Sequence, residues 1–437
     1  MGQVKAGGHT LTPDPSQADV IVVNTCSFIE SAQQESVNTI LEMADFKKTG
    51  RAKRLVVAGC MVERFRKEFG AQLPEVDALV GTSEIERITG ACRGEEPAPN
   101  PLEPYLYHDL TPRVRATPRH YAYLKIAEGC DHPCSFCVIP QFRGAFRSRR
   151  FESVVLEAGR LFRDGVREIN LIGQDTTSYG EDLGIRDGLA HLLTRLAQIE
   201  TPGQKWIRFL YAYPNRITQK LLETIAEFPS LVKYIDMPLQ HASAAILKRM
   251  RRGGSGDGFL RLLERIRRTI PGVAIRTSFI VGFPGESEDD FRELCQFVEA
   301  ARFDHMGVFS YSDEETSRSF ALDGKVGRRA IYDRQRRLMS IQRRISRRLK
   351  RAMSGREAPV LVEGPSPETP LLWQGRLATQ APEIDGVCYI NDDGGRPLAP
   401  GEFRLLRVTR THDYDLVGAI VDEPPRIECP TLLPVLA

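Results

Sequence analysis

The sequence predicts an α/β protein in three parts: an N-terminal α/β domain, a central partial β/α barrel and a small C-terminal antiparallel β-barrel. Three observations predict this division. Apolar strand-like runs alternate with helical patterns through the first two parts, and a Pro-rich stretch at 95–118 interrupts them. After residue 354, short strands separated by Gly/Pro turns replace the alternation. A chain of 437 residues is long enough for two to four domains that each bury a core.

Composition narrows the class of protein without naming a function. Hydrophobic residues make up 41% and charged residues 27%, which is ordinary for a globular protein. No apolar run reaches the eighteen or so residues of a membrane span, and a net charge of +3 does not by itself indicate nucleic-acid binding. Nine cysteines and the absence of a signal peptide disfavour a secreted, disulfide-linked framework. We therefore expect a cytoplasmic protein with no membrane partner.

The predicted N-terminal domain, residues 1–94, contains two apolar strands that each end in cysteine. They are ADVIVVNTC (18–26) and RLVVAGC (54–60). Because parallel strands place their carboxyl ends at one edge of a sheet, Cys26 and Cys60 are expected to lie together. Cys92 is a weaker third candidate, and two buried structural cysteines are the alternative.

Residues 95–118 are predicted to be a linker or strap, and residues 119–327 a run of βα units. The chemistry of such a barrel lies at the carboxyl ends of its strands. Each strand-end residue is a weak signal alone, but together we expect them to line one cavity. These residues are Gln174, Asp175, Tyr213, Pro214, Gln240, His241 and the segment from Gly282 to Glu286.

The strongest motif is EGCDHPCSFCVIPQFRG (128–144), directly after the first strand of the predicted barrel. Cys130, Cys134 and Cys137 supply three thiolates on one short loop, enough for three corners of a four-iron four-sulfur cluster with the fourth iron left open. An open position indicates a catalytic cluster, and S-adenosylmethionine is a carrier of radical chemistry. A structural zinc site needs a fourth ligand, which His132 inside the first spacer is poorly placed to supply. Coincidence is the remaining alternative.

The last third of the chain combines a basic helix with a small barrel. Residues 328–354 are predicted to be a connecting helix, for which a solvated surface is favoured over an RNA-binding face. Residues 355–423 fit an antiparallel barrel of about five strands. Such a barrel often holds nucleic acid or a protein segment, and the alternative is that it only braces the larger domain. Its acidic residues suit a basic protein loop better than phosphates. They are Glu383, Asp385, Asp413 and Asp415. Residues 424–437 form a predicted tail.

Several of these motifs together resemble one family, the radical S-adenosylmethionine methylthiotransferases. The resemblance rests on NTC (24–26), AGC (58–60), the three-cysteine loop, MPLQHAS, FIVGFPGE and a C-terminal barrel of the TRAM type. WIRFLYAYP (206–214), GVFSYSDEETS (307–317) and APEIDG (381–386) resemble the branch that modifies an aspartate of ribosomal protein S-twelve. The branch that modifies adenosine in transfer RNA usually shows Ser-His-Pro where this chain has Ala212, Tyr213 and Pro214.

The resemblance implies a transferase that adds a methylthio group to the β-carbon of that aspartate on the small ribosomal subunit. It implies two 4Fe-4S clusters, one held by Cys130, Cys134 and Cys137 and one with Cys26 and Cys60 among its ligands. It also implies a reducing partner such as flavodoxin or ferredoxin. The residues expected to bind S-adenosylmethionine are Phe136, Gln174, Asp175, Gln240, His241, Gly282 and Glu286. No catalytic side chain is assigned.

One departure concerns the third ligand of the second cluster. Members of the family normally have a strand ending in Gly-Cys before the segment that here begins MGQVKAGGHT. We expect the natural start to lie upstream of Met1; a paralogue with only radical or methylating activity is the alternative. Two other functions remain open: a transfer-RNA adenosine methylthiotransferase, and a non-catalytic iron–sulfur or zinc scaffold that binds RNA and does not cleave S-adenosylmethionine.

Overall fold

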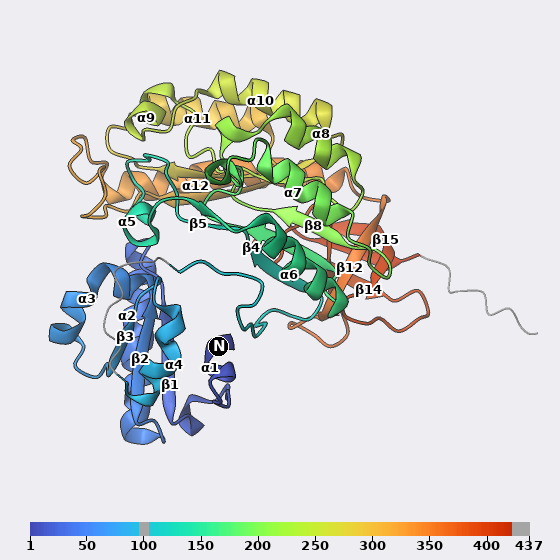
Figure 1. Ribbon diagram of the computed structural model, residues 1–437. Helices are drawn as coiled ribbons and strands as arrows, with labels where there is room; N and C mark the ends of the chain where they lie inside the picture. Colours follow the sequence, from blue (N-terminus) through green and yellow to red (C-terminus); the bar gives the residue numbers. More distant parts are fainter. Residues whose placement is uncertain (96–104, 422–437) are drawn as a thin grey trace, which may run out of the picture.

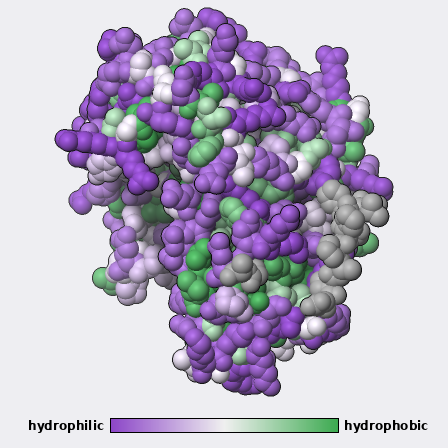
Figure 2. Space-filling view, turned by 90° about the vertical axis from the view of Figure 1, so that its left-hand side faces the viewer, coloured by the Kyte–Doolittle hydropathy of each residue, from purple (hydrophilic) through white to green (hydrophobic). Residues whose placement is uncertain are grey.

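The computed structural model of the chain describes residues 1–95 and 105–421. An N-terminal α/β domain lies beside one end of a larger central unit, and a small β-barrel lies at the other end (Figure 1). Hydrophilic residues cover most of the face in Figure 2, with smaller hydrophobic areas in its lower half. The predicted tail at 424–437 and residues 96–104 of the predicted linker lie outside the described residues.

The N-terminal domain is a parallel sheet in the order β1 (Val20–Thr25), β2 (Arg54–Gly59), β3 (Ala78–Val80). Its helices are α1 (Gly2–Ala6), α2 (Glu30–Thr49), α3 (Cys60–Gln72) and α4 (Ile88–Arg93), with 3₁₀ turns η1 (Pro15–Gln17) and η2 (Ile85–Arg87). Thr25 pairs with Gly59 at the carboxyl ends of β1 and β2. The two cysteines that follow these strands therefore begin at the same edge of the sheet, as the sequence predicted.

The central unit is a partial barrel of six parallel strands. They form two sheets, β4 (Tyr121–Lys125), β7 (Glu168–Ile172) and β8 (Trp206–Phe209), then β9 (Tyr234–Asp236), β10 (Ala274–Val281) and β11 (His305–Ser310). A parallel bridge between Ile207 and Leu231 joins β8 to the chain just before β9. The helices are α6 (Phe151–Arg163), α7 (Gly188–Ala197), α8 (Gln219–Glu227), α9 (Ala244–Arg249), α10 (Gly256–Thr269) and α11 (Glu288–Ala301). Shorter elements are β5 (Ala127–Glu128), α5 (Ile139–Arg143), β6 (Arg147–Ser148), η3 (Glu181–Leu183) and η4 (Pro214–Arg216).

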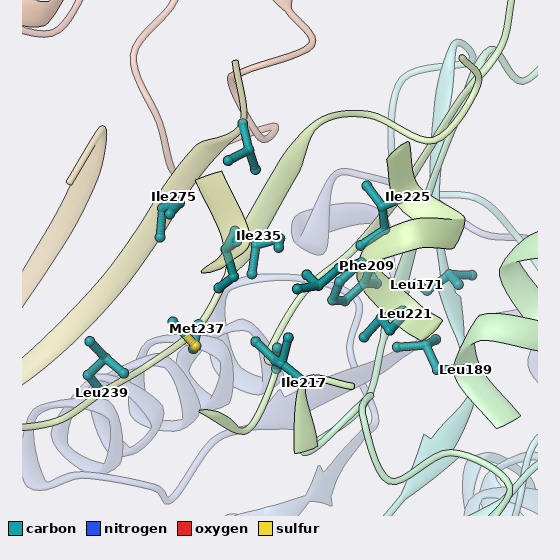
Figure 3. Close-up of a cluster of buried hydrophobic side chains, with 14 of the residues drawn as sticks. Leu171, Leu189, Phe209, Ile217, Leu221, Ile225, Ile235, Met237, Leu239 and Ile275 are labelled. Atoms are coloured by element: carbon teal, nitrogen blue, oxygen red, sulfur yellow. The ribbon is translucent and has the colours of Figure 1, made fainter. Parts of the chain in front are cut away.

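Apolar side chains between these strands and their covering helices form the main core. In Figure 3, Phe209 of β8 lies among Leu171 of β7 and Leu221 of α8, and Ile235 lies farther along the same layer. All four side chains are buried, and burying one such side chain stabilises a fold by about 1.5–3 kcal/mol. This packing fixes the strand ends that carry the predicted site residues.

The C-terminal part begins with α12 (Arg328–Arg351), which packs on β11 and α11. The closed barrel that follows has the order β12-β13-β14-β16-β15. Its strands are β12 (Glu357–Pro365), β13 (Trp373–Leu377), β14 (Cys388–Asp392), β15 (Phe403–Thr411) and β16 (Leu416–Ile420). The five strands agree with the sequence prediction, except that β14 and β16 pair in parallel and the other neighbours pair antiparallel.

A buried ionic network joins the small barrel to the central one. Glu168 of β7 accepts hydrogen bonds from Arg208 Nε at 3.1 Å and from Arg376 Nη2 at 2.6 Å. Arg376 also donates to Glu363 Oε1 at 2.6 Å. Trp206 packs on Phe403 of β15, with ring centroids 4.8 Å apart. The small barrel is therefore firmly braced against the larger one.

The expectation that four acidic residues of the small barrel suit a basic protein loop is wrong for Asp385, and it stays a prediction for Glu383, Asp413 and Asp415, which are at least partly exposed. Asp385 is buried, and it accepts a hydrogen bond from the Tyr234 hydroxyl at 2.7 Å. Glu383 accepts a hydrogen bond from the Tyr121 hydroxyl of β4, also at 2.7 Å. The other two carboxylates bind Arg347 and the Val387 amide. These acidic groups are already bound within the chain, which the sequence spacing does not reveal.

Candidate radical-cluster and sulfur site

The three-cysteine loop is held at the carboxyl end of β4 by hydrogen bonds from several segments. The Cys130 amide donates to the Gly144 carbonyl at 3.3 Å, and the Cys137 amide donates to the Cys134 carbonyl at 3.2 Å. Both the amide and the hydroxyl of Ser135 donate to backbone carbonyls at the end of α9, each at 2.9 Å. Gly129, with φ +79°, has room only for glycine because a Cβ would lie 2.1 Å from the Ala145 carbonyl oxygen.

The electrostatics of the loop favour a cationic occupant. Burial raises the pKa of Cys130 to about 11 and that of Cys137 to about 12, and the charges of neighbouring thiolates add to both shifts. Two thiols with such pKa values would stay protonated at neutral pH without added positive charge. Iron supplies that charge and binds thiolates, so the donor set fits an iron–sulfur cluster.

The arrangement differs from that of a single-metal site. Within residues 1–95 and 105–421, no group of three Cys, His, Asp or Glu side chains converges closely enough to hold one metal ion. A tetrahedral zinc ion needs such convergence, whereas the cysteines of a four-iron cluster bind separate irons and stand farther apart.

A stack of polar and aromatic side chains supports the loop from β7 and the segment after β8. His132 Nε2 lies 2.7 Å from Asp175 Oδ2, and its ring stacks on Tyr213 at a centroid distance of 3.6 Å. Arg252 covers the other side of the Tyr213 ring at 4.5 Å and donates to Cys134 Sγ at 3.5 Å. Burial alone would raise the pKa of Asp175, but the hydrogen bonds from His132 and its neighbours lower it. His132 thus has a structural partner in Asp175.

The structure brings some of the predicted S-adenosylmethionine residues to the loop and places others in the barrel wall. Gln174 Oε1 accepts a hydrogen bond from the Gly129 amide at 2.9 Å, directly beside Cys130. Phe136 packs among apolar side chains that include Met250 and Phe283. Gln240 has φ +74° at the end of the segment after β9.

His241 and Glu286 form a separate pair inside the wall. Both side chains are fully buried, and His241 Nε2 lies 3.6 Å from Glu286 Oε1. The Gly282 amide and Arg334 Nη1 bind the other oxygen of Glu286. This pair is therefore enclosed within the protein.

A second pair of thiols lies at the carboxyl edge of the N-terminal sheet. Cys26 is exposed and Cys60 is buried against Val138 and Phe142 of the central unit. Burial raises the pKa of Cys60, while Arg143, whose Nη2 lies 3.0 Å from the sulfur, lowers it. The pKa of Cys60 is raised further because a negative charge on Cys26 would repel a negative charge on Cys60.

Cys92 does not join this pair. It is buried on α4 among Val4, Val56 and Val80. Two thiols of the described chain therefore fit two corners of a second cluster, and the suggestion of Cys92 as a third ligand is wrong.

An ionic chain links the two cysteine sites. Arg143, the last residue of α5, donates to Cys60 through Nη2 and contacts Glu128 through Nη1 at 3.3 Å. Glu128 also pairs with Lys125 at the end of β4. The sequence analysis missed this chain. The only sequence signal was the position of Arg143 inside the motif, since its partner in the N-terminal domain is 83 residues away.

Buried polar contacts seat the N-terminal domain on the barrel mouth. Arg64 of α3 donates to Glu314 and to the Thr316 hydroxyl, both at 3.0 Å, and to the Ser27 carbonyl at 2.9 Å. The side chains of Arg64 and Glu314 are each only 7% exposed. These contacts hold the N-terminal domain, which carries Cys26 and Cys60, against the central unit, which carries the three-cysteine loop.

Comparisons with known proteins agree with this architecture. Residues 124–298 match the model of the radical SAM superfamily, residues 1–81 that of the Uncharacterized protein family UPF0004, and residues 355–421 that of the TRAM domain. A protein of Solibacter usitatus (strain Ellin6076), named "Ribosomal protein uS12 methylthiotransferase RimO", is 70% identical over 96% of this chain and 90% of its own length. This chain belongs to the ribosomal protein uS12 methylthiotransferase family.

A second uS12 methylthiotransferase, from Koribacter versatilis (strain Ellin345), is 54% identical over 96% of this chain and 92% of its own. Among solved structures, the radical S-adenosylmethionine methyltransferase TsrM of Kitasatospora setae has a TM-score of 0.50 at 15% identity, covering 67% of this chain and 64% of its own. That likeness concerns the fold alone. Membership of the uS12 methylthiotransferase family confirms the predicted family, fold class and transferase activity.

Proposed function

We propose that this chain transfers a methylthio group to the β-carbon of an aspartate in uS12, the ribosomal protein S-twelve of the small subunit. The single observation that carries the proposal is the high identity to uS12 methylthiotransferases over nearly the whole chain. The seating of the N-terminal cysteines against the three-cysteine loop supports it. We infer that the reaction takes place in the cytoplasm.

Cys130, Cys134 and Cys137 are the proposed ligands of the radical cluster. When bound, a four-iron cluster with S-adenosylmethionine supplies one-electron radical chemistry, and a flavodoxin or ferredoxin is the proposed electron donor. Gln174 and the support built on Asp175 fix the loop, and Arg252 places positive charge beside Cys134. The Arg64–Glu314 contact between the domains is buried, and such burial beside the reacting region limits side reactions with water.

The remaining predicted residues have proposed roles around S-adenosylmethionine. Phe136 offers an aromatic surface for the adenine, and Gln240 and Gly282 shape the mouth at the ends of adjacent strands. His241 and Glu286 act from the wall by fixing the backbone at Gly282.

Cys26 and Cys60 are the proposed ligands of a second 4Fe-4S cluster that carries the sulfur to be transferred. Their position at the carboxyl edge of the sheet faces the barrel, and the Arg143 contact stabilises a thiolate at Cys60. The second cluster rests on the family resemblance and on these two thiols.

The test is mass spectrometry of uS12 after anaerobic turnover with the reconstituted enzyme. Addition of a methylthio group to one aspartate is the expected result, and a Cys130→Ala/Cys134→Ala/Cys137→Ala variant should give none. Unmodified uS12 beside methylthiolated adenosine in transfer RNA would overturn the assignment. Iron analysis accompanies the assay: about eight irons per chain are expected with both clusters and about four in the triple variant, since each cluster holds four. Failure to cleave S-adenosylmethionine would favour a non-catalytic scaffold.

A further inference from the structure

Helix α12 exposes a set of arginines that have no acidic partner among the described residues. The helix has 24 residues, of which only Asp333 is acidic. Four of its exposed arginines are paired: Arg337 with Glu288, Arg344 with Glu299, and Arg343 and Arg347 with Asp413. Those exposed without an ion pair, called here the basic face, are Arg328, Arg329, Arg336, Arg348 and Arg351.

Helix α12, which carries the basic face, runs along the central unit toward the small C-terminal barrel (Figure 1). Near its start, Arg334 binds Glu286 at 3.2 Å, and Ile331 packs on Gly282 at the barrel mouth. Near its end, the Ser346 hydroxyl donates to the Asp413 carbonyl at 2.6 Å. A helix of 24 residues is about 36 Å long, so the charge extends well beyond a single small anion.

Exposed tyrosines accompany the free arginines at both ends of the helix. Tyr332 is 57% exposed, and the Arg336 guanidinium lies 5.6 Å from its ring centroid. Tyr414 is 39% exposed in a groove that is lined by Arg347, Arg351 and His412 and also by the carboxylates of Asp413 and Asp415. Arginines that bind phosphates next to aromatic rings that stack on bases are typical of surfaces for single-stranded nucleic acid.

The same helix lacks the features of a membrane-binding helix. Interfacial helices expose a large apolar face. Here the apolar side chains Ile331 and Leu338 are buried against the central unit, and the exposed side is arginine, tyrosine and other polar residues.

We propose that the basic face of α12 binds the ribosomal RNA backbone next to uS12 and so orients the small subunit toward the barrel mouth. This inference rests on the proposed function, since uS12 is a component of a ribonucleoprotein particle. RNA is the proposed partner because the surface combines unpaired arginines with exposed aromatic rings. The helix is also long enough to contact several phosphates of one strand.

The first test measures binding of the full chain to a labelled single-stranded RNA of about 20 nucleotides by fluorescence anisotropy over a salt series. The variant Arg328→Glu/Arg329→Glu/Arg336→Glu should weaken binding at least tenfold at low salt. Because each lost phosphate contact on a single strand changes the slope of log K against log salt by about 0.7, the slope should fall by about two. All three side chains are exposed, so circular dichroism should show an unchanged fold.

The matched control is Arg163→Glu/Arg186→Glu/Arg195→Glu, which makes the same charge change at exposed arginines away from α12. Its RNA affinity should stay within twofold of the wild type. Equal weakening by both variants, or no RNA binding by the wild type, would overturn the proposal. Tighter binding to vesicles containing phosphatidylserine than to RNA, lost in the basic-face variant, would also overturn it in favour of a membrane surface.

A second test compares modification of free uS12 with that of assembled small subunits. The basic-face variant should modify free uS12 at the wild-type rate and small subunits at least tenfold more slowly. Equal rates on subunits would contradict the proposal. If the wild type modifies neither form, the proposed function fails, and the RNA-binding measurement still decides the inference about α12.

Discussion

Glu168→Gln is expected to weaken the contact between the central unit and the small barrel by about 3–5 kcal/mol. The carboxylate is fully buried between two guanidinium groups, Arg208 at 3.1 Å and Arg376 at 2.6 Å. The network of these three residues with Glu363 has two positive and two negative charges. The glutamine keeps the shape of the side chain and leaves one positive charge buried without compensation.

Tryptophan fluorescence during urea unfolding measures this change directly. The chain has two tryptophans: Trp206 packs on Phe403 of the small barrel, and Trp373 lies within that barrel. For a urea slope of about 2 kcal/mol per molar, a loss of about 3 kcal/mol lowers the midpoint of the fluorescence transition by about 1.5 M.

The control is Glu357→Gln, which breaks the exposed pair with Arg407 and should cost less than about 1 kcal/mol. Equal midpoints for the Glu168 and Glu357 variants would refute the reasoning. Adding Arg376→Met to Glu168→Gln removes the uncompensated charge and should recover part of the loss, a coupling that a double-mutant cycle measures.

The same carboxylate makes the contact sensitive to acid. Burial alone would raise the pKa of Glu168, but Arg376 and Arg208 outweigh burial and hold it below its ordinary value of 4.5. Because the folded pKa is the lower one, this stabilisation is complete above about pH 4.5 and is lost as the pH falls through the folded value. In Glu168→Gln this part of the acid dependence should be absent.

Two further substitutions test the candidate site. Gly129→Ala forces a Cβ against the Ala145 carbonyl oxygen and should reduce the iron bound after reconstitution, although every cysteine is kept. The control is Gly165→Ala, because Gly165 has a similar positive φ but open space around it. This control variant should bind iron normally. Arg64→Met leaves Glu314 buried without its partner and should raise amide hydrogen exchange in residues 312–317 at least tenfold, as mass spectrometry would detect. Normal iron content in the first variant, or unchanged exchange in the second, would contradict these structural arguments.

Local sequence patterns were sufficient for the elements whose cause is local. The apolar runs before Cys26 and Cys60 predicted parallel strands with their ends together, which the structure confirms. The spacing of Cys130, Cys134 and Cys137 predicts one metal-binding loop, and this stays a prediction. Both predictions depend on neighbours along the chain, or on the regular geometry of a parallel sheet.

Contacts between distant segments were not predictable in the same way. Asp385 looks like a surface carboxylate in sequence, yet it is buried beside Tyr234, 151 residues away. Arg143 reaches Cys60 in another domain, and nothing in the local pattern identifies that sulfur as its acceptor. Such pairings arise from how domains dock, for which a single sequence gives no periodic signal.

The continuity of α12 has a consequence for how the enzyme selects its target. Because an unbroken helix resists compression and bending, the barrel mouth and the small C-terminal barrel are kept a fixed distance apart. We therefore expect the helix to set the distance between the barrel mouth and the small C-terminal barrel. An aspartate would reach the mouth only when it lies at that distance from the surface that the small barrel contacts. Selection by distance allows one aspartate to be chosen among many chemically identical ones.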